Sequence, residues 1–211
     1  MTPEAFATAT GVSRETLDRL KAYAAILEKW QKAINLVGPS TLPDLWQRHF
    51  LDSAQLYTLA PAEARVWVDL GSGAGFPGLV LAILGAPEMH LVESDGRKMA
   101  FLSEAARATG TKVHFHRSRI EALKPFPADV VSARALAALD KLVGYARPFC
   151  HSGTVMLFPK GVDAEAELTA AAKNWKMAPQ RVQSRSDAGG VILKFTGIPE
   201  PQPPNPQEMD R

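Results

Sequence analysis

The sequence predicts an α/β fold with a doubly wound, mostly parallel seven-stranded sheet and a helical extension before it. Three observations support this prediction. From residue 65 onward, short apolar runs alternate with helical patterns, a glycine-rich loop follows the first run, and a hairpin pattern closes the series. Strands that alternate with helices form parallel sheets, because each helix returns the chain to the same edge of the sheet.

The residues before this series have a helical pattern. Apolar residues recur at spacings of three, four and seven over residues 17–34, and Ser13 is placed to cap the helix that they predict. Turn-forming residues fill 35–43, and a second helix is expected over about 44–59. We therefore expect residues 1–62 to be an N-terminal helical extension that packs on the core.

The domain that follows is expected to span residues 63–198. A S-D-A-G-G turn between residues 180–184 and 191–195 predicts a terminal antiparallel hairpin. The proline-rich residues 199–211 are expected to form a disordered tail. The other expected strands are 66–70, 90–93, 113–116, 129–132 and 154–158, and the expected helices are 79–84, 97–109, 137–147 and 164–175.

The composition is that of a globular protein. Hydrophobic residues make up 46% of the chain and charged residues 22%, which argues against a disordered or fibrous chain. Cys150 is the only cysteine, so the chain forms no internal disulfide and has no CxxC zinc motif; we expect it to be an ordinary core residue. Neither a secretory signal nor a membrane-spanning apolar run is visible, so a monomeric cytoplasmic protein without membrane contact is expected.

Positive charge is concentrated in one part of the chain, although the formal net charge is only +2. Such a stretch can neutralise nucleic-acid phosphates, or it can be the solvated ends of helices and strands. The pattern alone leaves both interpretations open. Between residues 94 and 119 the basic residues are Arg97, Lys98, Arg107, Lys112, Arg117 and Arg119, against Asp95 and Glu104.

The most specific local pattern is V-W-V-D-L-G-S-G-A-G-F-P-G at residues 66–78. Gly71, Gly73 and Gly75 allow a tight turn at the carboxyl end of a strand, where a ligand can approach the backbone. A dinucleotide site requires G-x-G-x-x-G, and here the third glycine comes one position early. Asp69 would also repel a pyrophosphate, whereas it suits the positively charged methionine portion of S-adenosylmethionine. The loop therefore favours S-adenosylmethionine over NAD.

A carboxylate ends the second expected strand, about twenty residues after the glycine loop. Glu93, with Ser94 next to it, lies where a carboxylate accepts hydrogen bonds from both ribose hydroxyls of an adenosine. NAD sites share this feature, so Glu93 supports an adenosine ligand without choosing between the two cofactors. The other interpretation is a carboxylate that stabilises the N-terminus of the next helix.

The chain resembles the GidB/RsmG family, which methylates N7 of a guanine in 16S ribosomal RNA. The glycine loop alone indicates only a methyltransferase, and the R-H-F-L-D-S block upstream of a G-F-P-G loop makes the resemblance specific. The matching segments are K-W-Q-K-A-I-N-L-V at 29–37, R-H-F-L-D-S at 48–53, D-L-G-S-G-A-G-F-P-G at 69–78, V-E-S-D-G-R-K-M-A-F-L at 92–102, S-R-I-E at 118–121, S-A-R-A at 132–135 and P-K-G at 159–161.

The resemblance implies a class I S-adenosylmethionine-dependent fold and assigns residue roles. It places Gly71 and Phe76 at the cofactor, and Ile120 and Glu121 at its adenine end. It implies that Arg134 lies in the active site beside the cofactor. It further implies that 16S ribosomal RNA, within the 30S subunit or an assembly intermediate, is the partner. The residues expected to contact this RNA are Arg48, His49, Lys98 and Lys160.

Two of these residues also have purely structural interpretations. Arg48 and Asp52 can form an ion pair four residues apart on one helix. Arg134 can belong to a structural ion pair near a strand end.

Guanine N7 carries a lone pair and no proton, so the expected reaction is a direct in-line attack on the methyl group without a general base. Positioning in a desolvated pocket would then supply most of the catalysis.

The sequence also leaves three alternative functions open. They are a methyltransferase of the same fold that acts on a protein or small molecule, an NAD-dependent oxidoreductase, and a non-catalytic RNA-binding module.

His114 and His116 alternate along one expected strand, a spacing that suits metal ligands. The sequence places no carboxylate or third histidine in evident proximity to them. No metal site is therefore expected.

Overall fold

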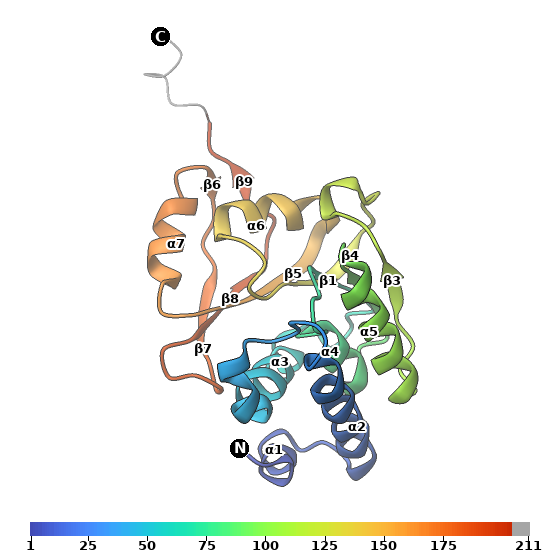
Figure 1. Ribbon diagram of the computed structural model, residues 1–211. Coiled ribbons are helices and arrows are strands. Elements are labelled where there is room, and N and C mark those ends of the chain that lie inside the picture. The colour runs from blue at the N-terminus through green and yellow to red at the C-terminus, as the bar shows by residue number, and fades with distance from the viewer. Residues whose placement is uncertain (204–211) are drawn as a thin grey trace.

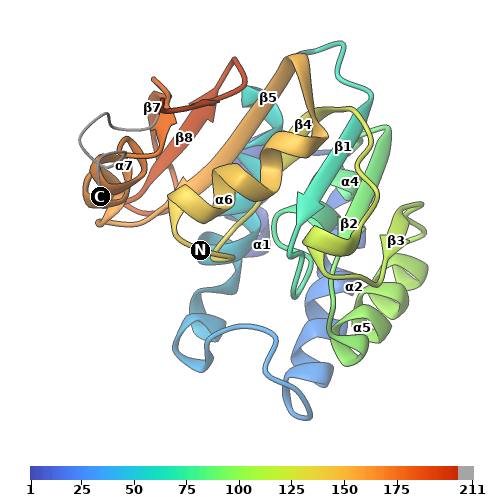
Figure 2. The same cartoon turned by 90° about the horizontal axis from the view of Figure 1, so that it is seen from above.

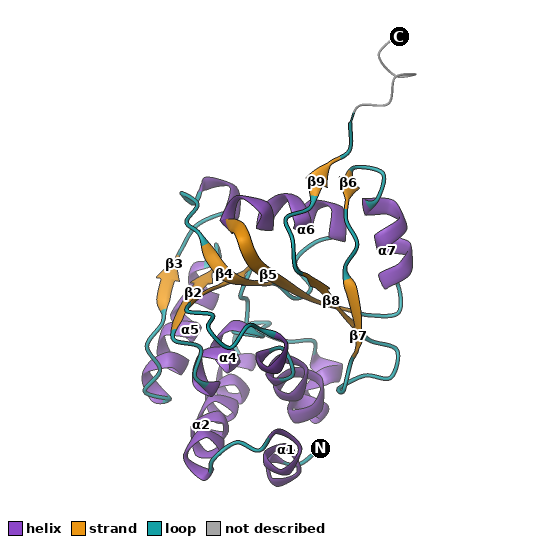
Figure 3. Cartoon of the chain, turned by 180° about the vertical axis from the view of Figure 1, so that it is seen from behind, coloured by secondary structure: helices purple, strands orange, loops and turns teal. Residues whose placement is uncertain are grey.

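A computed structural model describes residues 1–203 and shows one mixed seven-stranded sheet between two layers of helices (Figures 1 and 3). The strand order is β3-β2-β1-β4-β5-β8-β7. The first five of these strands run parallel, and β8 and β7 are antiparallel to their neighbours, which confirms the expected doubly wound sheet and its closing hairpin. The strands are β1 (Val66–Leu70), β2 (Glu88–Val92), β3 (His114–His116), β4 (Ala128–Ser132), β5 (Cys150–Lys160), β7 (Gln180–Gln183) and β8 (Val191–Phe195).

The order of the strands reverses between β1 and β4. β1 leads to β2 and β3 on one side, and β4 leads to β5 and the hairpin on the other. Ligands of open α/β sheets bind at the carboxyl ends of the strands beside such a reversal. The fold therefore places the glycine loop, which follows β1, at the expected ligand position.

Helices cover both faces of the sheet (Figures 1 and 2). The N-terminal helices share one face with the helices that follow β1 and β2, and the helices that follow β4 and β5 lie on the opposite face. The first layer contains α1 (Pro3–Thr10), α2 (Arg14–Gln31), α4 (Gly78–Leu84) and α5 (Gly96–Ala108), and the second contains α6 (Leu139–Ala146) and α7 (Ala164–Ala171).

Successive side chains of β1 point to opposite faces of the sheet, so they belong to two apolar cores, one under each helical layer. Trp67 faces the N-terminal layer and Val68 faces the layer of α6 and α7. Both residues are almost completely buried, as expected for a strand of a parallel sheet with helices on both faces. Among the described residues, no helix combines the length and apolar character that a membrane span requires.

The N-terminal helices share their core with the sheet. Ser13 caps α2 as expected, since its side chain accepts a hydrogen bond from the Thr16 amide. Phe6 and Tyr23 are fully buried, and Tyr23 stacks on Phe76 of the glycine loop at a centroid distance of 5.4 Å. The N-terminal residues thus support the loop, while a domain boundary between residues 62 and 63 stays a prediction.

Two expectations were wrong. Instead of one helix over 44–59, the chain forms a 3-10 helix (Pro39–Asp44), a π-helix (Trp46–Leu51), the short α3 (Asp52–Ala54) and a 3-10 turn (Tyr57–Leu59). The tail expected to be disordered from residue 199 contains β9 (Glu200–Pro201), which pairs with β6 (Trp175–Lys176) outside the main sheet. The rest of that tail, 204–211, lies outside the described residues. Two more 3-10 turns, Ile120–Ala122 and Arg147–Phe149, complete the elements.

Candidate functional site

A cavity of about 370 Å³ lies over the glycine loop at the carboxyl ends of β1 and β2, and we call it the glycine-loop cavity. Its volume is in the usual range for small-molecule sites. Gly73 has a φ of 55°, and a Cβ atom there would meet only the Gly71 carbonyl oxygen, at 3.8 Å, so the backbone is accessible to a ligand. Most of the residues expected at the cofactor line this cavity, namely Gly71, Gly73, Phe76, Glu93, Ser94, Ile120, Glu121 and Arg134.

Glu93 follows β2 directly, and backbone amides fix its carboxylate at the cavity wall. One oxygen accepts a hydrogen bond from the Gly73 amide at 2.9 Å, and the other accepts one from the Asp95 amide at 2.7 Å. Each carboxylate oxygen has a second lone pair, so the group keeps acceptor capacity for a ligand. Glu93 therefore connects the glycine loop to the start of α5 and can also bind hydroxyl groups.

Asp69 and Gly75, which were also expected at the cofactor, do not line the cavity. The Asp69 side chain is fully buried beneath the loop, where it accepts hydrogen bonds from the Ser132 hydroxyl at 2.8 Å and the Gly78 amide at 3.2 Å. Burial raises the pKa of Asp69 to about 6, although the bond from Ser132 opposes this shift. In this structure Asp69 shapes the loop from below. Gly75 lies against Tyr23, whose hydroxyl donates a hydrogen bond to the Ala74 carbonyl.

The far end of the glycine-loop cavity is formed by the 3-10 turn at Ile120. Glu121 accepts a hydrogen bond from the Tyr145 hydroxyl at 2.7 Å. A backbone hydrogen bond and then this bond from Tyr145 lower the pKa of the carboxyl. Lys98 also lines this cavity, although it was expected to contact RNA. Its position on the first turn of α5 places a positive charge near Glu93 and Ser94.

A second cavity of about 760 Å³ adjoins the first, and we call it the hairpin cavity because the β7–β8 turn forms one side. Arg48, His49, Asp52, Lys160 and the loop around Arg134 form other parts of its wall. Arg134, Ala135 and Leu136 line both cavities. The loop after β4 is thus the boundary between two adjoining binding spaces.

Arg134 contacts four groups at this boundary. Its Nη1 donates to the Arg48 carbonyl at 3.1 Å and lies 3.3 Å from the Asp52 carboxylate. Its Nη2 lies 2.7 Å from Nδ1 of His49, and the guanidinium carbon lies 5.1 Å from the centre of the Phe76 ring. With 17% of the side chain exposed, the guanidinium is fixed and partly desolvated.

His49 is neutral at this position. Burial, followed by the positive charges of Arg134 and Arg48, lowers the pKa of His49 to about 3. Because a guanidinium can only donate, Nδ1 of His49 is the acceptor, so Nε2 carries the proton and donates to the Thr41 hydroxyl at 2.8 Å. His49 was expected to contact RNA, yet only 8% of the residue is exposed and its ring nitrogens bind Thr41 and Arg134.

The alternative interpretation of Arg48, an ion pair with Asp52, is not what the structure shows. Arg48 instead lies 3.6 Å from Asp187 in the β7–β8 turn, and Asp52 pairs with Arg134 and accepts a hydrogen bond from Ser186 at 2.6 Å. In the π-helix the Arg48 carbonyl accepts from Arg134. The altered helical geometry explains why spacing alone predicted the wrong partner.

Lys160 is less accessible than a lysine that contacts RNA on the surface. Only 9% of its side chain is exposed, and its ammonium donates to Glu167 at 2.7 Å and to the Ala137 carbonyl at 3.2 Å. The same Glu167 oxygen accepts from the Leu139 amide at the start of α6. Lys160 therefore anchors the loop between Arg134 and α6.

The sheet order, the glycine loop and the acidic end of β2 define a class I methyltransferase fold. Solved structures with this fold include a TehB-like SAM-dependent methyltransferase from Corynebacterium glutamicum, with a TM-score of 0.57 and 10% identity over 84% of this chain and 99% of that chain. Ribosomal protein L11 methylase from Lactobacillus delbrueckii subsp. bulgaricus has a TM-score of 0.56 and 16% identity, over 69% of this chain and 78% of that chain.

The sequence matches the family model of GidB, rRNA small subunit methyltransferase G, over residues 16–191. Ribosomal RNA small subunit methyltransferase G of Rhodospirillum rubrum is 60% identical over 198 residues, which cover 94% of this chain and 98% of that protein. The chain belongs to the GidB family. The resemblance seen in the motifs is thereby confirmed.

Sequence reasoning missed several residues of the site. Asp52 is part of the R-H-F-L-D-S block, where its spacing indicated an ion pair with Arg48 and no contact with Arg134. Ser186 stood in the S-D-A-G-G turn, which indicated a hairpin and no binding role. Tyr145 had no motif at all, and only the three-dimensional fold brings it to Glu121.

Proposed function

We propose that this protein transfers a methyl group from S-adenosylmethionine to N7 of a guanine in 16S ribosomal RNA. The observation that carries the proposal is the position of Arg134, which lines both of the adjoining cavities. A group-transfer enzyme needs two sites with a common boundary, so that the donor and acceptor atoms meet there. Membership of a family named for methylation of small-subunit ribosomal RNA supports this substrate class.

The residues of the glycine-loop cavity fit the proposed cofactor. Glu93 offers carboxylate oxygens to ribose hydroxyls, Gly73 leaves room for close approach to the backbone, and Ile120 and Glu121 close the end assigned to adenine. S-adenosylmethionine supplies an electrophilic methyl group on a positively charged sulfur. The chain contributes binding and orientation.

The hairpin cavity is the proposed site of the guanine base. It is about twice as large as the glycine-loop cavity and is reached past the exposed Arg48, whose positive charge suits a phosphate backbone. Arg134 can orient the base through O6, since arginine pairs well with that edge of guanine. It has to leave N7 free, because N7 is the atom that attacks.

The groups around the boundary fit a reaction without a general base. Neutral His49 already accepts a hydrogen bond from Arg134 through Nδ1, and its lowered pKa makes it a poor proton acceptor at neutral pH. Asp52 is paired with Arg134. Guanine N7 needs no deprotonation, so these residues serve by fixing geometry, and alignment with the methyl group supplies the rate enhancement.

The direct test is transfer of labelled methyl groups to 30S subunits, and separately to naked 16S RNA, from cells that lack this activity. We expect label at N7 of a single guanine. Demonstrated cofactor binding without transfer to either RNA form would contradict the ribosomal assignment and favour a protein or small-molecule substrate. Label on another atom of the RNA would contradict the N7 assignment alone.

The role of Arg134 is tested in the same assay under single-turnover conditions. Arg134→Ala is expected to slow transfer roughly a hundredfold, the usual effect of misplacing reactants by about 1 Å. Arg14→Ala, an exposed arginine on α2 outside both cavities, is the matched control and should transfer at the wild-type rate. A wild-type rate for Arg134→Ala would show that Arg134 orients neither guanine nor cofactor.

A further inference from the structure

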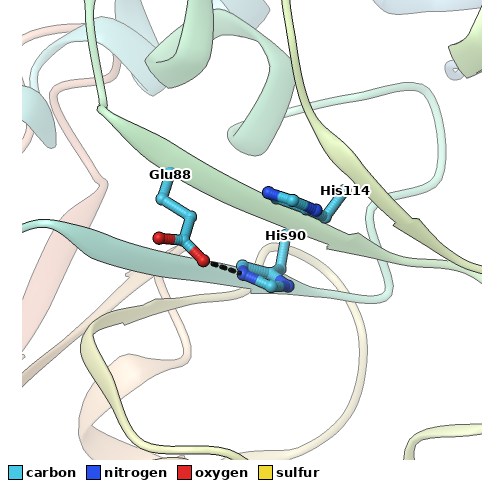
Figure 4. Close-up of side chains that lie close together, drawn as sticks. All are labelled: Glu88, His90 and His114. Atoms are coloured by element: carbon cyan, nitrogen blue, oxygen red, sulfur yellow. Dashed lines mark hydrogen bonds and ion pairs between the residues drawn. The ribbon is translucent and has the colours of Figure 1, made fainter.

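A cluster of imidazole and carboxylate side chains lies on β2 and β3, away from both cavities. His90 and His114 are direct neighbours in the parallel register of these strands. Glu88 lies two residues before His90, and His116 two residues after His114, so all four side chains project from the same face. Figure 4 shows Glu88 directed toward His90, with the ring of His114 stacked against the ring of His90.

The premise on which no metal site was expected is therefore wrong. His114 and His116 have both a carboxylate and a third histidine beside them, because the pairing of β2 with β3 brings Glu88 and His90 to them. This arrangement depends on strand register, which the spacing of residues within one strand does not show.

The distances within the cluster suit a small cation. One ligand atom from each of Glu88, His90 and His114 can be chosen so that all lie within 4.8 Å of one another. The Glu88 oxygen lies 3.1 Å from Nε2 of His90, close to the separation of about 3.3 Å between two ligands of a tetrahedral ion with bonds of about 2.0 Å. Nδ1 of His90 lies 2.8 Å from Nε2 of His116.

We propose that Glu88, His90 and His114 bind a late divalent transition metal ion such as Zn²⁺, with His116 supporting His90. Two imidazoles and a carboxylate form a ligand set that zinc accepts, whereas magnesium and calcium prefer oxygen ligands throughout. His116 would fix the orientation of the His90 ring through Nδ1, as partners of metal-binding histidines commonly do.

The side chains have the freedom that binding requires. The rings of His90 and His114 are stacked, with their planes 17° apart, so His114 has to turn to direct a nitrogen at an ion bound to Nε2 of His90. His114 is exposed, and 49% of the Glu88 side chain is exposed, so both can move. Phe126 packs on His90 at a centroid distance of 4.4 Å and keeps that ring in place.

The consequence of binding is structural. β3 is a three-residue strand at the edge of the sheet, and the ion would connect it to β2 through His114. Glu93 follows β2, and its amide donates to the His116 carbonyl, so the same strand pair supports the glycine-loop cavity. An ion bound only by the folded chain stabilises it by mass action.

The test is zinc titration of the full, tag-free chain against a chromophoric competing chelator, with Co²⁺ absorption as a measure of coordination. We expect one site per chain and tetrahedral-type Co²⁺ bands. Cys150 does not compete as a thiolate, because burial raises its pKa to about 12. His90→Gln and His114→Gln should each weaken zinc binding at least about tenfold, the smallest loss seen when even an outer partner of a ligand is removed.

His151→Gln is the matched control. His151 is another histidine that binds a carboxylate, Asp129 at 3.1 Å, and it lies outside the cluster. This variant should bind zinc with wild-type affinity. Zinc should raise the melting temperature of the wild type and of His151→Gln but not of His90→Gln.

Melting curves recorded in the presence of a chelator show whether each variant is folded without zinc. His114→Gln, at an exposed edge position, provides a second variant if His90→Gln unfolds. Absence of zinc binding in the wild type, or equal binding by all variants, would overturn the proposal.

Discussion

Nη2 of Arg134 lies 2.7 Å from Nδ1 of His49, so a neutral imidazole is the acceptor for the guanidinium at the boundary of the two cavities. The contact joins the π-helix to the loop after β4, two segments that are far apart in the sequence. It fixes the arginine without neutralising it. The Asp52 carboxylate, 3.3 Å from Nη1, balances the positive charge, while His49 fixes the direction of the guanidinium.

Removing this acceptor should slow methyl transfer. A hydrogen bond to a charged group contributes about 1.5–3 kcal/mol, so we expect His49→Ala to lower the single-turnover rate roughly ten- to hundredfold. His49→Asn, whose side-chain oxygen can accept from Arg134, should recover part of the rate. If His49→Ala transfers as fast as the wild type, the contact does not position Arg134 for the reaction.

The same histidine should make stability depend on pH. The pKa of His49 is about 3 in the folded chain and near 6.5 in the unfolded chain, so the unfolded chain binds more protons between these values. The contribution of His49 to the free energy of unfolding is complete above pH 6.5 and falls as the pH decreases toward 3, with a slope of up to about 1.4 kcal/mol per pH unit.

Denaturant unfolding at several pH values, compared between the wild type and His49→Asn, measures this contribution. Other titrating groups affect both proteins and cancel in the difference. Asp69 has the opposite sign, since its raised pKa favours the folded chain at low pH, and it too is present in both. A difference that stays constant from pH 4 to 7 would contradict the assignment of a buried, neutral His49.

Glu93→Gln should weaken S-adenosylmethionine binding. The amide keeps one acceptor oxygen but loses the charge and the second acceptor, so the variant cannot hold the Gly73 amide and both ribose hydroxyls as the carboxylate can. We expect the dissociation constant from calorimetry to rise roughly ten- to hundredfold. Glu28→Gln, the same change at an exposed position on α2, controls for the loss of charge, and equal affinities in both variants would argue against a ribose contact.

Arg48 should contribute to RNA binding and little to stability. Its pair with Asp187 is exposed, and such pairs add at most about 1 kcal/mol to the free energy of unfolding. Arg48→Gln is expected to weaken RNA binding and to reduce the slope of log affinity against log salt by about 0.7–0.9, the value for one phosphate contact. An unchanged salt slope would show that Arg48 does not meet a phosphate.

The glycine loop and the end of β2 could be predicted from the sequence because their chemistry is local. Gly71 and Gly73 mark a turn at a strand end, and Glu93 has a fixed distance from it along the chain. The mostly parallel sheet and the terminal hairpin followed from the same kind of short-range pattern. For this reason the fold class and the residues of the glycine-loop cavity were largely anticipated.

The other relationships depend on geometry that spacing does not contain. Asp52 has the spacing of a helical partner for Arg48, yet a π-helix places it beside Arg134. Lys160 resembles a surface lysine in the sequence, but the fold buries it against Glu167. Only the register between β2 and β3 brings His90 to His114.

The central proposal is transfer to guanine N7, and an atom-specific substrate tests it most directly. 16S RNA transcribed with 7-deazaguanosine has a C–H group in place of N7, and it should be compared with ordinary transcript in the RNA form, naked or reconstituted, that accepts methyl groups. We expect full transfer to the ordinary transcript and none to the 7-deaza transcript. Equal transfer to both would contradict attack by N7 and place the methyl group on another atom.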